Sequence, residues 1–113
     1  MSSIRAELWC AAFLRRHNDL GSICVVSRRG DPIAGQVWIE VDHIDGTSSL
    51  FTQAPSAAIK SEEISWVFQR RFDRVPNQTV KQRIEKEINF DPDFWLLTLE
   101  SRGSEYGLTI LKE

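Results

Sequence analysis

The spacing of apolar residues near the start of the chain predicts a helix over residues 3–20. Apolar side chains recur there at intervals of three and four, as they do along one face of an α-helix. Ser3 can cap the start of this helix, and Gly21 supplies a left-handed residue at its end. The apolar stripe consists of Ile4, Leu8, Ala11 and Ala12, widened by Trp9 and Phe13. We expect this stripe to face the core.

From Ser22 onward the period changes to two, which is typical of β-strands. A second helix interrupts the strands, since Asn77 can cap it and Pro92 prevents its continuation. Its apolar stripe is formed by Val80, Ile84 and Ile88. The predicted strands cover residues 22–29, 36–44, 48–53, 63–72, 94–100 and 106–111, with a loop over 53–62.

This order of elements, α-β-β-β-β-α-β-β, predicts an α+β fold. We expect a mostly antiparallel sheet of about five to six strands with two helices packed on it. A chain of 113 residues buries enough surface for one core but not for two. Residues 1–113 are therefore expected to form a single domain.

Turn residues set the expected pairing of the strands. Asp45-Gly46 is typical of a two-residue hairpin turn, which puts Glu40 opposite Phe51. A hairpin over residues 29–36 puts Cys24 opposite Val41, and another around residues 102–104 leads into the last strand. The expected core face holds Val37, Ile39, Val41, His43 and Leu50, and the opposite, mixed face holds Trp38, Glu40, Asp42 and Phe51.

Composition and charge limit the classes of partner. The chain is 42% hydrophobic and 27% charged, with a net charge of -2, so it has no global basic field for nucleic acid or anionic lipid. Residues 1–30 still hold five arginines against two acidic residues, which leaves room for a local basic patch. The longest apolar run, residues 8–14, is too short to span a membrane and lacks a signal-peptide cleavage site. Two cysteines in no redox or zinc motif indicate reduced thiols, so we expect a cytoplasmic protein without a membrane partner.

Four segments resemble a small uncharacterised bacterial family, found mainly in alphaproteobacteria, whose members have similar lengths. The segments are LWCAAFLRR (8–16), RRGDPIAGQVWIEV (28–41), the DGT turn (45–47) and NFDPDFWLLTLE (89–100). The resemblance covers most of the chain, although residues 53–63 match only loosely. The family is catalogued as a domain of unknown function. The resemblance therefore implies a single-domain cytoplasmic protein and supplies no catalytic residues.

The expected register allows one pairing of a nucleophile with a base. Cys24 and His43 would be diagonal neighbours on one face of the sheet. That face is otherwise apolar, and a free cysteine is more often a core residue than a nucleophile. Asp42 and His43 point to opposite faces of their strand, and Asp91-Pro-Asp93 is typical of a turn, so neither set meets the needs of a metal site. We assign no catalytic residue, metal or cofactor. An enzyme with a Cys/His site is kept as an alternative.

Arginines and aromatic residues suggest a second alternative, a nucleic-acid-associated protein. Three arginine pairs occur, and Trp38 and Trp66 on strands could stack on bases. Adjacent strand residues diverge to opposite faces, so only one arginine of a strand pair can serve a given surface. The arginines in question are Arg28, Arg70 and Arg71. Ion pairs with nearby carboxylates are the simpler explanation of these residues.

The leading hypothesis is a non-enzymatic protein-interaction domain, with a homodimer as one form. Trp38 and Phe51 are large aromatic residues on the expected mixed face, beside Glu40. Either the second helix covers these aromatic side chains, or a partner or second subunit does, or they form an exposed patch. The predicted binding residues are Trp38, Glu40, Phe51, Arg28, Arg70 and Arg71.

Overall fold

The computed structural model describes residues 5–55 and 66–111. Over these ranges the chain forms helices α1 (Ala6–Asp19) and α2 (Asn77–Phe90) and strands β1 (Ile23–Arg28), β2 (Gln36–Asp42), β3 (Thr47–Gln53), β4 (Val67–Pro76), β5 (Phe94–Glu100) and β6 (Thr109–Ile110). The predicted cap Ser3, most of the predicted loop over 53–62 and the first part of the predicted strand 63–72 lie outside the described residues.

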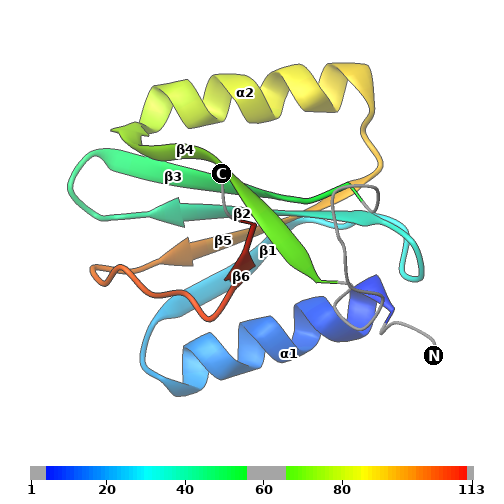
Figure 1. The fold of residues 1–113 in the computed structure, drawn as a ribbon, viewed down its shortest axis with the longest axis horizontal. Coiled ribbons are helices and arrows are strands. Elements are labelled where there is room, and N and C mark those ends of the chain that lie inside the picture. The colour runs from blue at the N-terminus through cyan, green and yellow to red at the C-terminus, as the bar shows by residue number, and fades with distance from the viewer. Residues whose placement is uncertain (1–4, 56–65, 112–113) are drawn as a thin grey trace.

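The strands form a six-stranded sheet in the order β1-β5-β2-β3-β4-β6. Pairs β2–β5 and β4–β6 are parallel and the other three are antiparallel. Helix α1 covers one face of the sheet and α2 covers the other (Figure 1). This confirms the predicted α+β fold with two helices on a mostly antiparallel sheet. No helix within the described ranges is long and apolar enough to cross a membrane.

Helix α1 turns only part of the predicted stripe to the sheet: Phe13 and Trp9 pack there, Leu8, Ala11 and Ala12 do not, and Ile4 lies outside the described residues. Its buried residues are Ala6, Cys10, Phe13 and His17, which also follow helical spacing. Leu8 is 59% exposed, and Ala11 and Ala12 lie on the outer side. The prediction was wrong for Leu8, Ala11 and Ala12 because α1 carries two apolar faces. The face that packs on the sheet is the one with the large aromatic side chains, Phe13 and Trp9, whose rings stack at 5.2 Å.

Strand β5 lies between β1 and β2, which the sequence analysis expected to pair with each other as a hairpin. Strand β1 pairs with β5, not β2, and Cys24 lies opposite Leu99. Strand β2 lies on the other side of β5, with Val41 opposite the same Leu99. Five of the seven residues of β5 are buried, on both faces of the sheet, which suits a central strand. Strands β1 and β2 thus pair with both edges of β5, and no edge is left for β6. The predicted hairpin around residues 102–104 is therefore wrong, and β6 pairs with β4 instead.

The loop between β1 and β2 packs on the start of β5. The backbone N–H of Asp31 donates to Asp93 Oδ1 at 2.9 Å, and Trp95 Nε1 donates to the Asp31 carbonyl at 2.8 Å. A Cβ on Gly35 would lie 2.6 Å from the Asp31 carbonyl oxygen, and one on Gly30 would lie 2.8 Å from the backbone of β5. The RRGDP and FDPDFW segments that carry the family resemblance therefore form one tightly packed junction.

The register of β2 with β3 differs by one residue from the prediction. The N–H of His43 bonds to the Thr47 carbonyl at 3.0 Å, so the turn has three residues, with positive φ at Ile44 and Gly46. Ile39 then lies opposite Phe51, and Glu40 lies opposite Leu50. A shift of one residue moves a side chain to the other face of a sheet. Leu50 therefore packs under α2 and Phe51 under α1, the reverse of the prediction.

Candidate ligand pocket between helix α2 and the sheet

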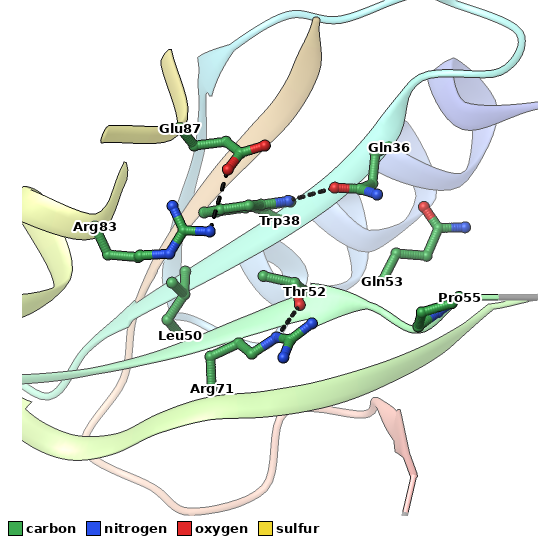
Figure 2. Close-up of a pocket in the computed structure, with 9 residues that line it drawn as sticks. All are labelled: Gln36, Trp38, Leu50, Thr52, Gln53, Pro55, Arg71, Arg83 and Glu87. Atoms are coloured by element: carbon green, nitrogen blue, oxygen red, sulfur yellow. Dashed lines mark hydrogen bonds and ion pairs between the residues drawn. The ribbon is translucent and has the colours of Figure 1, made fainter. Parts of the chain in front are cut away.

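A pocket of about 310 Å³ opens beside α2, above strands β2, β3 and β4 (Figure 2). Pockets of this size accommodate small organic molecules. Its lining residues are Gln36, Trp38, Leu50, Thr52, Gln53, Pro55, Arg71, Arg83 and Glu87. The pocket thus combines a small apolar floor with walls of polar and charged side chains.

Trp38 forms the floor of the pocket and is tied in place. Its side chain is 3% exposed and packs in the cluster of residues beneath α2. The indole N–H donates to Gln36 Oε1 at 2.7 Å. The Arg83 guanidinium lies over the indole, 5.1 Å from the ring centroid, and its Nη2 lies 3.1 Å from Glu87 Oε1, one helical turn away. Arg83 is therefore held between an aromatic face and a carboxylate.

A β-bulge directs Arg71 towards the same pocket from the opposite wall. Arg70 pairs with Phe51 and Phe72 with Leu50, so Arg71 is the extra residue of β4. Its Nε donates to Thr52 Oγ1 at 2.8 Å, which fixes the guanidinium and leaves its two terminal nitrogens free of that bond. Figure 2 shows the two guanidinium groups approaching from different sides, Arg83 from α2 and Arg71 from β4.

The remaining polar groups of the pocket are mainly donors. Gln53 Oε1 accepts from the Val37 N–H at 3.1 Å, and Gln36 Oε1 accepts from Trp38, so both glutamines have used their carbonyl oxygens. Their amide nitrogens keep two donor hydrogens each. Two arginines against one glutamate give the lining a formal charge of +1. This arrangement can hold a small anion, and its lining offers no Cys, His or Ser for catalysis.

The structure separates the other predicted binding residues. Phe51 is 1% exposed on the α1 side, with Arg70 over its ring at 5.7 Å, so the prediction that it shares a face with Trp38 is wrong. Arg28 donates from Nε to the Pro92 carbonyl at 2.8 Å, at the far edge of the sheet from β4. The structure therefore brings Trp38 and Arg71 together in one pocket, whereas Arg28 and Arg70 do not line it.

Glu40 lies on the same face as Trp38 but lines a different groove. Its Oε1 accepts from Thr98 Oγ1 at 3.2 Å, and its Oε2 lies 3.7 Å from Lys81 Nζ. This groove, of about 380 Å³, is closed on one side by Ile84. Cover by the second helix, one of the alternatives left open for the mixed face, accounts for the burial of both Trp38 and Glu40.

The predicted Cys24–His43 pair does not form, because β5 separates β1 from β2. Cys24 lies in the core cluster with Cys10, and neither forms a disulfide. Burial raises the pKa of Cys10 to about 12 and that of Cys24 to about 11. Both thiols thus stay protonated at neutral pH and are poor nucleophiles. The described part of the chain brings together no group of three His, Cys, Asp or Glu side chains suited to a metal ion.

His43 instead belongs to a buried polar cluster that sequence spacing did not reveal. Its Nε2 lies 2.8 Å from Ser49 Oγ, which also accepts from the Arg74 N–H at 3.0 Å and lies 3.4 Å from Asp73 Oδ1. Burial, and after it the charge of Arg74, lowers the pKa of His43. The carboxylate contacts the serine and not the imidazole, and Ser49 is 1% exposed. The cluster therefore holds a second bulge of β4 in place, and no substrate can reach the hydroxyl.

Sequence reasoning missed the pocket residues on α2 and at the ends of β2 and β3. Arg83 and Glu87 had a detectable signal, since they stand four positions apart on the predicted helix. Gln36, Thr52 and Gln53 had none, because their convergence depends on the pairing of β2 with β3.

Comparison with known proteins places the chain in a family. A family model described as "Protein of unknown function (DUF1491)" matches residues 4–109, nearly the whole chain. The chain belongs to this family. The resemblance drawn from its sequence segments is thus confirmed, and no function comes with DUF1491 membership. A search of curated proteins gives no match.

Solved structures share the fold of this DUF1491 chain. The solution structure of a protein from A. tumefaciens has a TM-score of 0.82 at 24% identity, covering 99% of this chain and 98% of that one. The crystal structure of a DUF1491 family protein from Caulobacter crescentus has a TM-score of 0.78 at 24% identity, covering 96% of this chain and all of the other. Both organisms are alphaproteobacteria. At this identity the likeness shows the fold alone.

Proposed function

We propose that this DUF1491 chain is a ligand-binding domain whose pocket beside α2 takes a small organic monocarboxylate. The observation that carries the proposal is the set of donors facing the pocket: two guanidinium groups and two glutamine amide nitrogens, opposed by a single carboxylate. A guanidinium matches a carboxylate with two parallel hydrogen bonds. Each arginine is already fixed by other contacts, so binding costs little further ordering.

Charge and backbone geometry favour a carboxylate over a phosphate. The formal charge of +1 balances one negative charge, and Glu87 opposes a second. Phosphate sites commonly use the N-terminus of a helix, whereas Arg83 lies at the middle of α2 and Glu87 in its last turn. The apolar floor of Trp38 and Leu50 suits the organic part of the ligand.

Titration with benzoate tests this proposal. The readouts are the NMR signals of the Trp38 indole N–H and of the Arg71 and Arg83 side-chain N–H groups. We expect saturable shifts with a Kd on the order of 1 mM, a reasonable affinity for so small a ligand. Neutral benzamide and inorganic phosphate serve as matched probes. Both should bind at least about tenfold more weakly than benzoate, benzamide because it has no negative charge and phosphate because it has more than one.

Matched variants assign the binding to the pocket. Arg71→Gln removes the charge and the terminal guanidinium nitrogens but keeps a polar side chain, and should weaken benzoate binding at least about tenfold. Arg102→Gln, at an exposed arginine in another part of the chain, should leave it unchanged. Absence of any shift at Trp38 up to about 10 mM benzoate, or equal affinity of the Arg71→Gln variant, overturns the proposal.

We also propose a cytoplasmic location. Cys10 and Cys24 support it, because both are free thiols, as is usual for cysteines of proteins in a reducing compartment. Fractionation of cells that produce the tagged chain tests the proposal, with recovery in the cytoplasmic fraction expected and recovery in an oxidising compartment contradicting it.

A further inference from the structure

Helix α1 presents an apolar surface where a covering helix is normally polar. Leu8 and Leu20 are 59% and 73% exposed, and Ala11 and Ala12 lie exposed between them. A depression of about 660 Å³ follows this side of the helix, and its lining joins these apolar residues to the charged Arg15, Arg16 and Asp19. The outer side of α2, by contrast, carries polar side chains, among them Gln82, Glu85 and Lys86. A helix that is apolar on two sides is typical of one that packs against two neighbours, and the sheet supplies only one.

Parts of both sheet edges are already occupied from within the chain. The side chain of Asn18 pairs with both backbone groups of Cys24, accepting from its N–H and donating to its carbonyl, each at 3.0 Å. The N–H of Ser22 is bonded to the His17 carbonyl. Asn18 thus pairs with the first part of the outer edge of β1, at Cys24, as a neighbouring strand would. At the opposite edge, β6 has only two residues.

The charges along α1 complement those of a reversed copy of the same helix. An antiparallel second copy centred on Ala11–Ala12 sets Arg5 beside Asp19 of that copy, on one flank of the helix. On the other flank Glu7 comes within reach of Arg15 of the second copy, which lies seven residues after Leu8, near the middle of the face. By two-fold symmetry each pair occurs twice. Within the described residues all four side chains are exposed and form no ion pair of their own.

We propose that the outer face of α1 is a two-fold interface with a second copy of this chain. Ala11 and Ala12 cross at the centre and let the two helices approach closely, with Leu8 beside them. The four complementary pairs select the antiparallel arrangement, because a parallel one sets like charges together. The 14 residues of α1 span about 21 Å, so the interface is smaller than the standard one of about 800 Å² per partner. The dimer therefore dissociates readily, with a Kd on the order of 0.1 mM.

Sedimentation equilibrium from about 20 µM to about 1 mM chain tests the proposal. The mass should rise from monomer towards dimer over this range, and less so at high salt, which screens the ion pairs. Ala12→Arg puts a large charged side chain at the crossing point and should abolish the dimer. Lys86→Glu, a charge change on the exposed side of α2, is the matched control and should leave it intact.

Charge exchange gives the sharper test. Arg5→Glu and Asp19→Arg each set like charges together and should weaken the dimer about fivefold, whereas the double variant should restore it. Both changes improve the match to the dipole of α1, so destabilised folding cannot explain a loss of association. A monomer at about 1 mM, a dimer that survives Ala12→Arg, or a double variant without recovery overturns the proposal. Its outcome is independent of ligand binding in the pocket.

Discussion

Asn18 offers a direct measure of how much one side chain stabilises a sheet edge. Replacing it by alanine removes the two hydrogen bonds with Cys24, each contributing about 1 kcal/mol net, and an exposed bond to the Leu14 carbonyl, whose loss water offsets. Alanine is the better helix former and adds about 0.6 kcal/mol to the unfolding free energy at this position. The Asn18→Ala variant should therefore lose about 1.5 kcal/mol of unfolding free energy.

Urea denaturation followed by circular dichroism measures this loss. With a slope of about 1.5 kcal/mol/M for a chain of this size, the midpoint should fall by about 1 M. Gln82→Ala on the exposed side of α2 is the control and should change the free energy by less than about 0.5 kcal/mol. The amide of Cys24 should also exchange faster in Asn18→Ala. An unchanged midpoint together with unchanged exchange would refute the assigned role of Asn18.

Two further predictions concern buried titratable groups. Burial lowers the pKa of His17 and of His43 below the usual 6.5, so the unfolded state binds more protons than the native state does near that pH. Stability should be full above about pH 6.5 and fall as the pH drops below it, measured as urea midpoints; a flat profile would contradict this. Cys10 and Cys24, with pKa values of about 12 and 11, should resist iodoacetamide in the native protein at pH 8 and react once it is unfolded, as mass spectrometry would show. Rapid alkylation of the native chain would disprove their burial.

The sequence was sufficient to predict the elements of the fold but not their neighbours. Helical and alternating periods depend on short stretches of chain, so both helices and most strands were predictable. The order of strands in the sheet depends instead on which apolar segment takes the central position. Strand β5 is apolar on both faces, which indicates a central position, yet hairpin signals at residues 29–36 and 102–104 favoured local pairing. Contacts between distant segments overrode those local signals.

The candidate site was predictable only in part, for a geometric reason. A single additional residue in the turn before Thr47 exchanged the faces of Leu50 and Phe51. The bulge at Arg71 likewise directed that side chain into the pocket, and no alternating pattern reveals a bulge. Trp38 was found because an aromatic residue beside polar neighbours on a strand is noticeable in the sequence. The glutamines became part of the site only once the strands were paired.

A crystal structure of the chain grown with benzoate tests the central claim most directly. Our account predicts the carboxylate between Arg71 and Arg83, within hydrogen-bond distance of at least one guanidinium, with the ring towards Trp38. The side chains of Arg71 and Arg83 should move little, since other contacts already hold them. A pocket that holds only water at saturating benzoate, or benzoate bound elsewhere on the chain, would contradict it.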